Sequence, residues 1–476
     1  MTNTVIKFGT DGWRAIIAED FTFDNVRICA QSVADYLRDT GAAELGVVVG
    51  YDTRFASEDF AAAVAEVIAG NGLVCYLCDR PAPTPVVSYS ILVQKAAGGV
   101  VITSSHNAAE WNGFKYKPEY AGSASPEVVA ELEKRIVRIQ TGGAVKRISL
   151  AEAQSRGLVR KIDPSAPYFE QLGKMIDVPP LRKAGLKVVH DAMYGAGIGY
   201  FKKLLSGDAT QIIEVHSERN PLFPGLARPE PIGTNLKDLM AAVVQNGAAI
   251  GLATDGDSDR LGVVDDKGEY VDQLRVFGLL ALYLLDIRGW RGPLVKSIST
   301  TSMIDKMGKL YGVPVIETPV GFKYIGPKMM EANALIGGEE SGGFGFRGHI
   351  PERDGILAGL FLLDMMGKLG KPSSQLVDYL FSKVGPHYYD RIDLEFPAEK
   401  REEILQRVRN TPPRVIDGED VVRIQTEDGF KYHTADGSWL LIRFSGTEPV
   451  LRVYTETHSP LRVKRILEAG RQLVGV

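Results

Sequence analysis

Apolar residues recur along most of the chain in two alternating patterns, helical spacing and short continuous runs. Near the start, apolar positions at intervals of three and four predict an amphipathic helix. They are Val26, Cys29, Val33 and Leu37. The uninterrupted apolar run Leu45–Val49 then predicts a strand that is buried on both faces. This alternation favours a mixed or parallel sheet that is covered by helices on both faces.

The same order of strand, loop and helix is predicted further along the chain. An alanine-rich helix is expected from Ser57, whose hydroxyl would cap its first turn. Leu186–His190 is typical of a strand that leads into a glycine-rich loop and a helix, and Ile250–Thr254 is typical of a strand that leads into Asp255. A third unit begins with the strand-like run Leu294–Ser297. These segments predict three successive α/β units.

The third unit is expected to close with the apolar helix Ile356–Met366, which Asp354 could cap. After about residue 384 the pattern changes to short strand-like runs that are separated by Asp-Gly turns, with two further helices. That change predicts a separate C-terminal α+β domain. The segments Pro164–Pro167 and Gly385-Pro386 are the most typical of linkers between domains.

Net charge and hydropathy exclude some kinds of partner. The formal net charge of -4 gives no broad positive surface for nucleic acid, so an anionic ligand would be met by local arginines, lysines and backbone amides. Asn3, Lys7 and Asp11 interrupt the segment where a signal peptide needs an apolar core. The longest apolar run, Val276–Leu285, is well short of the ~20 residues that span a bilayer. We expect a cytoplasmic protein that binds neither nucleic acid nor membrane.

Three cysteines cannot all form pairs, but Cys75 and Cys78 have the spacing of a redox or metal half-site. They lie in an apolar stretch between Gly72 and Pro81 that is typical of a strand, where residues three apart face opposite sides. We therefore favour two thiols in the core over a functional pair. This interpretation agrees with a reducing cytoplasm.

Three aspartates at alternate positions, Asp255, Asp257 and Asp259, follow a predicted buried strand. Carboxylates in a turning loop can converge on one hard cation, because Mg²⁺ and Ca²⁺ take oxygen ligands and offset the repulsion between the carboxylates. An EF-hand would need glycine at its sixth position and glutamate at its twelfth, where this chain has Arg260 and Asp266. A solvated acidic turn is the simpler alternative. Because an arginine and apolar runs enclose the loop, we favour a metal site.

A serine-rich loop, Thr103–Asn107, follows another predicted strand at Gly98–Ile102. A serine beside a histidine, here Ser105 and His106, could act as a nucleophile or carry a phosphate. The Gly-x-Ser-x-Gly elbow of hydrolases is absent around Ser105. Taken alone, the segment would more often be an ordinary turn. Its interest comes from Lys115 just downstream, which could return to the serine loop as an acid, a base or a phosphate partner.

Two glycine-containing loops later in the chain are suited to a sugar phosphate. In Gly338–Gly343, Glu339 and Ser341 offer acceptors for neighbouring sugar hydroxyls, and a purely structural glycine-rich hairpin is the alternative. Arg443–Pro449 combines an arginine, two hydroxyls and backbone amides that glycine makes accessible, which suits a phosphate monoester. A turn with a salt-bridged arginine is the alternative there.

Five stretches also occur in a characteristic order. FGTDGWR, TSSHN, DGDSDR, GEESGG and RFSGTEP resemble, in that order, the N-terminal arginine, phosphoserine, metal, sugar-recognition and phosphate-binding loops of the α-D-phosphohexomutase superfamily. The resemblance extends over essentially the whole chain. It implies three related α/β domains with mixed sheets and a C-terminal α+β domain around a central cleft. We expect these domains at residues 1–162, 163–268, 269–384 and 385–476.

The resemblance also implies roles for individual residues. Ser105 would be the phosphoserine, and its phosphate would complete a Mg²⁺ site with the three aspartates Asp255, Asp257 and Asp259. Arg14 and Arg260 would steady the transferring group, while Lys115 and His106 are implied for proton transfer. The residues implied for substrate binding are Glu339, Ser341 and Lys323 at the sugar, and Arg443, Ser445, Gly446 and Thr447 at the phosphate that is not reacting. The serine loop departs from the family at Ala108, where proline is usual.

The activity implied by this resemblance is the interconversion of hexose 1-phosphate and hexose 6-phosphate through a 1,6-bisphosphate, with glucose preferred over mannose. Gly343 favours a glucose-type enzyme, because the phosphoglucosamine branch commonly has histidine there. Mg²⁺ and glucose 1,6-bisphosphate, as activator, are the expected cofactors of a monomer or homodimer. A glucose 1,6-bisphosphate synthase is the alternative enzyme. A non-catalytic sugar-phosphate sensor is the alternative outside enzymes, although Ser105 and all three aspartates are present.

Overall fold

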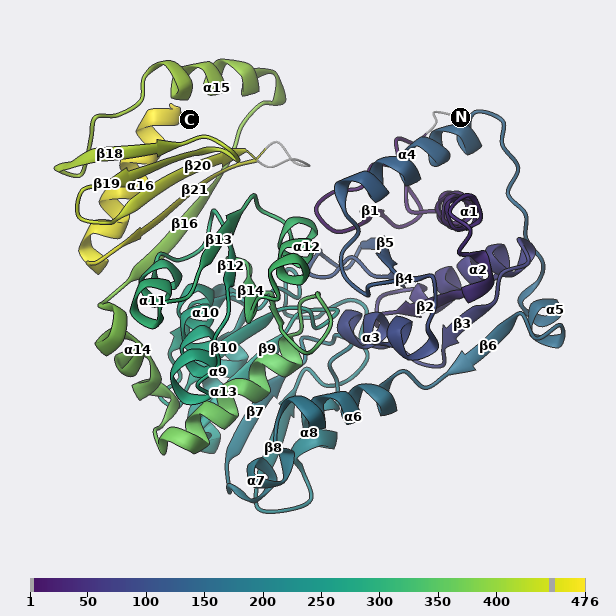
Figure 1. Ribbon diagram of the computed structural model, residues 1–476, viewed down its shortest axis with the longest axis horizontal. Coiled ribbons are helices and arrows are strands. Elements are labelled where there is room, and N and C mark those ends of the chain that lie inside the picture. Colours follow the sequence, from purple (N-terminus) through teal and green to yellow (C-terminus); the bar gives the residue numbers. More distant parts are fainter. Residues whose placement is uncertain (1–3, 445–449, 476) are drawn as a thin grey trace.

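The computed structural model describes residues 4–444 and 450–475, which form four sheets with their own helices (Figure 1). The first three sheets along the chain contain both parallel and antiparallel pairs, and the fourth is antiparallel. The predicted fold class, three α/β domains and a C-terminal α+β domain, is therefore confirmed. The exact boundaries at residues 162, 268 and 384 stay a prediction.

The N-terminal sheet has the strand order β1-β5-β4-β2-β3-β6. Its strands are β1 Trp13–Ile16, β2 Val47–Tyr51, β3 Cys75–Cys78, β4 Gly98–Ile102, β5 Trp111–Pro118 and β6 Val159–Ile162. The accompanying helices are α1 Phe23–Asp39, α2 Ser57–Gly70, α3 Thr84–Gln94, α4 Pro126–Gln140 and α5 Leu150–Ser155. Strands β2 and β4 are parallel, with Tyr51 opposite Ile102, so both strands end at the same edge of the sheet. The serine loop begins at that edge.

The second sheet, in the order β11-β10-β9-β7-β8, carries the aspartate loop between β9 and β10. Its strands are β7 Lys187–Asp191, β8 Gln211–Val215, β9 Ile250–Thr254, β10 Leu261–Asp265 and β11 Tyr270–Val271. The helices of this region are α6 Ser165–Met175, α7 Val178–Lys183, α8 Tyr200–Leu205 and α9 Lys237–Asn246. Every residue of β9 and β10 is buried, which holds the loop between them in a rigid setting.

The third sheet, in the order β13-β12-β14-β15, ends in a short hairpin that carries the predicted sugar loop. Its strands are β12 Leu294–Ser297, β13 Val315–Thr318, β14 Ile336–Gly338 and β15 Phe344–Phe346. The helices are α10 Gln273–Leu282, α11 Met303–Tyr311, α12 Phe322–Ala332, α13 Gly355–Leu369 and α14 Leu376–Val384. One apolar core joins all three α/β sheets, since it contains Val48, Leu252 and Leu294 together with Leu363 of α13.

The C-terminal domain has a sheet of its own, which lies next to the third sheet (Figure 1). Its strand order is β16-β21-β20-β19-β18-β17, and α15 Arg401–Asn410 and α16 Pro460–Val474 accompany it. The strands are β16 Tyr388–Glu395, β17 Val415–Ile416, β18 Glu419–Gln425, β19 Phe430–Thr434, β20 Trp439–Phe444 and β21 Val450–Thr457. A small apolar cluster of Ile298 with Trp439, Leu441 and Tyr454 joins this domain to the third sheet.

Two local predictions are wrong. Ser57 is the first helical residue of α2 rather than its cap, because its buried hydroxyl donates to Asp52 at 2.9 Å and accepts from Asn112. The segment Pro164–Pro167 is no linker, since α6 begins at Ser165. Proline is tolerated in the first turn of a helix, where the amides have no partner within the helix, so its presence did not mark a break.

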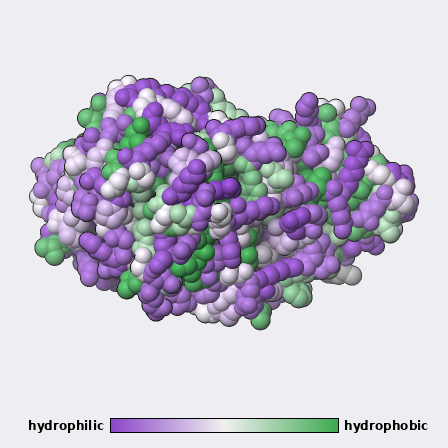
Figure 2. Space-filling model, turned by 90° about the horizontal axis from the view of Figure 1, so that it is seen from below, coloured by the Kyte–Doolittle hydropathy of each residue, from purple (hydrophilic) through white to green (hydrophobic). Residues whose placement is uncertain are grey.

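Other predictions are confirmed. Asp354 caps α13, and its carboxylate accepts from the Leu357 amide at 2.9 Å. Cys75 and Cys78 are buried free thiols in two different apolar clusters, as expected for opposite faces of β3. Within residues 4–444 and 450–475, no helix is both long and apolar enough to cross a membrane. On the face drawn in Figure 2, polar residues predominate and apolar ones form small scattered groups.

Candidate active site

The serine loop and the aspartate loop meet although 150 residues separate them in the chain. Ser105 follows β4, Asp255 follows β9, and both side chains are completely buried. The Ser105 hydroxyl donates a hydrogen bond to Asp255 Oδ2 at 2.8 Å. The fold therefore brings the predicted phosphate carrier to the predicted metal ligands.

Arg54 fixes the shape of the serine loop, a role that sequence reasoning missed. Its guanidinium donates to the carbonyl oxygens of Ser105, Asn107 and Ala108 at 2.6 to 2.8 Å. Asp52 lies 3.2 Å from Arg54 Nε and compensates the buried positive charge. Ser105 itself has a φ of 54°, in the left-handed region that residues with a β-carbon seldom adopt. The loop is thus held in a conformation that presents the hydroxyl to the aspartates.

The three aspartates form a group that can hold a metal ion. Ligand oxygens of Asp255, Asp257 and Asp259 all lie within 4.8 Å of one another, and all three residues are buried. Among the described residues, Asp257 Oδ1 and Asp259 Oδ1 are buried without a hydrogen-bond partner. Burial and the charges of Asp259 and Asp257 raise the pKa of Asp255 well above its ordinary value. Two unpartnered oxygens and crowded negative charge fit a hard divalent cation.

Lys115 reaches this group from β5, as its position downstream of the serine loop suggested. Its ammonium lies 2.7 Å from Asp257, 2.9 Å from Asp11 and 3.2 Å from Asp259. Burial would lower the pKa of Lys115, but Asp11, Asp257 and Asp259 outweigh burial and raise the pKa. Thr84 also donates to Asp257 Oδ2 at 2.5 Å. Lys115 is therefore a buried cation beside the predicted metal ligands.

His106, Arg14 and Arg260 also lie close to Ser105. His106 Nδ1 is 3.4 Å from Ser105 Oγ. Enclosure by protein, together with Arg260 and Arg14, lowers the pKa of His106 well below its ordinary value. Arg14 donates to Asn107 at 2.8 Å, while Arg260 lies 3.3 Å from Glu230. Arg14 of β1 and Arg260 of the aspartate loop thus both lie near the serine loop, a setting that suits a phosphate.

The predicted sugar residues approach the same region through Arg353, which sequence reasoning missed. Arg353 lies 2.7 Å from both Asp11 and Asp259 and 3.6 Å from Glu339. Burial raises the pKa of Glu339, and Arg353 opposes that rise. Ser341 is half-buried in the same hairpin loop. Arg353 therefore joins the aspartate loop to the predicted sugar loop, and no sequence pattern indicated this pairing.

Lys323 and Arg443 complete the described part of the predicted set. Lys323, at the start of α12, donates to the carbonyl of Gly9 in the N-terminal loop at 3.3 Å. Arg443, at the end of β20, donates from Nε to Asp428 at 3.0 Å. This contact is the one expected from the alternative interpretation of the segment, a turn with a salt-bridged arginine. Ser445, Gly446 and Thr447 lie outside the described residues.

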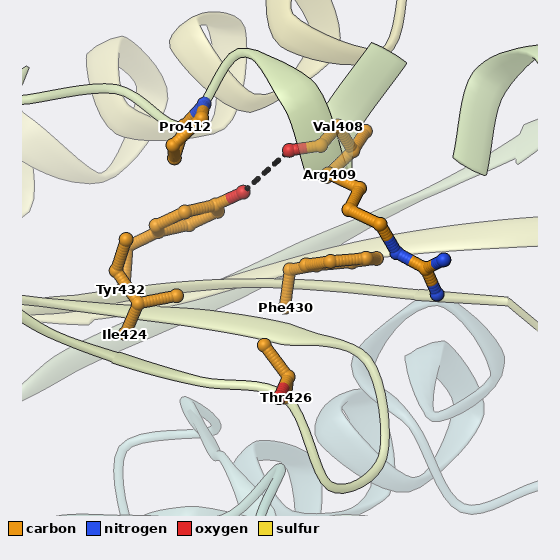
Figure 3. Close-up of a pocket in the computed structure, with 7 residues that line it drawn as sticks. All are labelled: Val408, Arg409, Pro412, Ile424, Thr426, Phe430 and Tyr432. Atoms are coloured by element: carbon orange, nitrogen blue, oxygen red, sulfur yellow. Dashed lines mark hydrogen bonds between the residues drawn. The ribbon is translucent and has the colours of Figure 1, made fainter. Parts of the chain in front are cut away.

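A separate pocket of about 370 Å³ lies in the C-terminal domain (Figure 3). Phe430 and Tyr432 of β19 line it below the end of α15, and the Tyr432 hydroxyl donates to the Val408 carbonyl at 3.4 Å. The rest of the lining consists of Arg409, Pro412, Ile424 and Thr426. None of the predicted site residues lines this pocket, so the candidate site is the buried cluster around Ser105.

Comparison with protein families gives four matches that together cover most of the chain. The models are described as phosphoglucomutase/phosphomannomutase, alpha/beta/alpha domains I, II and III, and the C-terminal domain. They match residues 5–142, 166–268, 272–384 and 396–472, respectively.

Individual proteins match over nearly their full length. The chain is 32% identical to the "Phosphoglucomutase/phosphomannomutase" of Thermococcus kodakarensis over 98% of both chains. It is 31% identical to a "Probable phosphoglucosamine mutase" of Thermococcus gammatolerans, again over 98% of both. The crystal structure of a Thermus thermophilus protein, described as a phosphomannomutase, superimposes with a TM-score of 0.86 at 33% identity and covers 100% of each chain.

Proposed function

The chain belongs to the α-D-phosphohexomutase superfamily, and we propose that it interconverts a hexose 1-phosphate and the corresponding hexose 6-phosphate. The observation that carries the proposal is the 2.8 Å contact between the Ser105 hydroxyl and Asp255 within the aspartate cluster. Phosphoryl transfer mainly requires positioning of the reactants and neutralisation of charge that spreads over the phosphoryl oxygens. Arg14, Arg260 and Lys115 supply positive charge around that contact.

In the proposed reaction Ser105 carries a phosphate. The bond between phosphorus and Ser105 Oγ breaks while phosphorus bonds to the free hydroxyl oxygen of the hexose phosphate. The attacking hydroxyl loses its proton, and Ser105 Oγ gains a proton and becomes a hydroxyl again. Lys115 and His106 are the candidates for these proton transfers. The 1,6-bisphosphate then turns round and returns its other phosphate to Ser105.

Asp255, Asp257 and Asp259 would hold Mg²⁺, with the phosphate of Ser105 as a further ligand. When bound, the ion supplies positive charge that stabilises the transferring phosphoryl group. The unpartnered oxygens Oδ1 of Asp257 and Asp259 support this assignment, because buried carboxylate oxygens without a partner are costly.

Glu339 and Ser341 would bind sugar hydroxyls, with Lys323 beside them. The phosphate that is not reacting would be bound by Arg443 together with Ser445, Gly446 and Thr447. Glucose is the proposed preferred sugar and mannose the second. Gly343 supports a glucose-type loop: a β-carbon there would lie 2.3 Å from Arg353 Cδ, so the histidine of the phosphoglucosamine branch would fit only if the Arg353 side chain moved.

An assay with the 1-phosphates of glucose, mannose and glucosamine, each with Mg²⁺ and a trace of the bisphosphate, tests the proposal. Rapid formation of glucose 6-phosphate is expected, with slower turnover of mannose 1-phosphate. Slow accumulation of bisphosphate from a second phosphoryl donor would instead indicate a glucose 1,6-bisphosphate synthase. Binding without turnover of any of the three would indicate a sensor. The proposed setting is a cytoplasmic monomer or homodimer.

A further inference from the structure

The loop of the β14–β15 hairpin, residues 339–343, is anchored on two sides by different domains. On one side the amide of Leu261, the first residue of β10, donates to the Gly342 carbonyl at 3.0 Å. The backbone of Arg260 also forms an isolated antiparallel β-bridge with that of Gly343. These contacts tie the loop to the strand that follows the aspartate cluster.

On the other side the C-terminal domain holds the loop through Glu340. Arg391 Nη1 lies 2.9 Å from Glu340 Oε1 and 3.2 Å from Oε2, and the Tyr389 hydroxyl donates to Oε1 at 2.5 Å. Tyr389 and Arg391 are two positions apart on β16, so both side chains leave the same face of the strand. The Glu340 side chain is only 12% exposed. The carboxylate is therefore enclosed by two donors from one strand.

The negative charge of Glu340 and the rigidity of β16 strengthen the contact of Glu340 with Arg391 and Tyr389. Burial would raise the pKa of the Glu340 carboxyl, but Arg391 and the Tyr389 hydroxyl outweigh burial and lower the pKa. Strand β16 is paired with β21 along its whole length, from Tyr388 opposite Thr457 to Glu395 opposite Val450. An ionised carboxylate on a short loop is thus bound to a strand that cannot shift independently of its domain.

We propose that Arg391 and Tyr389 are positioning residues for Glu339 and Ser341, acting through Glu340. The proposal deepens the proposed function and rests on it for the role of Glu339 and Ser341 as sugar ligands. Glu340 lies between these two residues in the chain, so its side chain fixes the backbone from which both project. The orientation of the sugar ligands then depends on how the C-terminal domain is seated.

Other contacts between the third and fourth sheets lie outside this loop. Glu456 accepts from the amide and the hydroxyl of Ser302 at 2.8 and 2.6 Å, and Lys431 donates to the Ile298 carbonyl at 2.5 Å. The apolar cluster around Trp439 lies at the same interface. Removal of the Arg391 side chain is therefore expected to release the loop while the domain stays attached.

Amide hydrogen exchange of the full chain tests the proposal without reference to activity. Arg391→Ala is expected to speed exchange in peptides covering residues 336–346 about tenfold, and Tyr389→Phe about threefold, as coupling energies between contacting groups allow. Peptides covering residues 295–304 at the interface should exchange as in the unmodified chain. Arg465→Ala, which removes a half-exposed partner of Asp417 in the same domain, is the matched control and should change neither region.

Kinetics supply the second readout. Arg391→Ala and Glu340→Gln are each expected to raise KM for the hexose phosphate about tenfold with kcat changed less than about threefold, and the double variant should be no worse than either. The Mg²⁺ concentration for half-maximal rate should not change. Unchanged exchange in residues 336–346, or equal loosening of residues 295–304, would overturn the positioning role. If the unmodified chain turns over no hexose phosphate, the proposed function fails, whereas the exchange result still decides whether Arg391 holds the loop.

Discussion

Gly256 of the aspartate loop faces the carbonyl oxygen of Ser105 so closely that a β-carbon at position 256 would lie 2.4 Å from that oxygen. The obstacle is backbone, which cannot rotate away as a side chain could. Because Arg54 also holds the Ser105 carbonyl at 2.7 Å, the serine loop has little freedom to retreat. The approach of the two loops therefore depends on glycine at position 256.

Gly256→Ala is expected to push the aspartates away from Ser105 and to lower kcat/KM by about 100-fold, since misplacement of reacting groups by about 1 Å has effects of that size. Steady-state kinetics check the expectation. Gly173→Ala is the matched control, because a β-carbon at this helical position in α6 meets nothing within 4 Å. If Gly256→Ala turned over as fast as this control, the close approach of the two loops would have no role in catalysis.

The aspartate group predicts dependence on a divalent cation. Chelation should abolish turnover and added Mg²⁺ should restore it, while Asp257→Asn should lower kcat by at least about 100-fold and weaken Mg²⁺ binding measured by calorimetry. Asp208→Asn, at an exposed position of the same domain, should leave both quantities unchanged. Full activity in the presence of chelator would contradict the metal assignment.

Arg353 is expected to be needed for both sites that it joins. Arg353→Met leaves the buried carboxylates of Asp11 and Asp259 with less compensation, and loss of one partner of a buried ion pair costs about 3–5 kcal/mol. We expect Arg353→Met to have a lower urea midpoint. Its KM for hexose phosphate should also rise, because Glu339 loses its contact with Arg353. Arg353→Lys, which keeps the charge, should recover part of the stability. Equal stability of Arg353→Met and the unmodified chain would argue against this role.

Lys431 predicts a pH dependence of stability in the alkaline range. Burial lowers its pKa from 10.5 to about 8, so between these values the unfolded chain binds more protons than the folded one. The free energy of unfolding should therefore rise with pH across this window, by up to ~3 kcal/mol from this group. Urea midpoints of the unmodified chain and Lys431→Met should diverge from about pH 8 to about pH 10.

Lys464→Met, on the exposed side of α16, is the control for that experiment. Its midpoints should follow those of the unmodified chain over the whole range. Parallel curves for Lys431→Met would mean that Lys431 keeps an ordinary affinity for protons in the folded protein.

The sequence predicted those elements that are defined by a single local signal. Strands β9 and β12 have the predicted bounds, because each begins with apolar residues and ends at polar or turn-forming ones. The loops that follow β4 and β9 could also be recognised as chemical sites. Their meeting could not be derived from local patterns, since it depends on how two sheets pack.

What the sequence did not predict are buried pairings between distant residues. Arg54 and Arg353 have the same local appearance as surface arginines, and only the fold shows that the first binds the serine loop and the second binds Asp11. Ser57 was a good local candidate for a helix cap, but its hydroxyl instead donates a hydrogen bond to the buried carboxylate of Asp52. In each case a tertiary partner outweighed the local preference.

Ser105 is proposed to carry the transferred phosphate, and peptide mass spectrometry can locate that phosphate. After incubation with glucose 1,6-bisphosphate and Mg²⁺, we expect one phosphate, on Ser105. Once the free bisphosphate has been washed away, an excess of glucose 6-phosphate should remove this phosphate as glucose 1,6-bisphosphate. Ser105→Ala should carry none and lose turnover by orders of magnitude, whereas Ser104→Ala, the neighbouring buried serine, should behave like the unmodified chain. A phosphate on a different residue, or near-full activity of Ser105→Ala, would show that Ser105 does not carry the transferred phosphate.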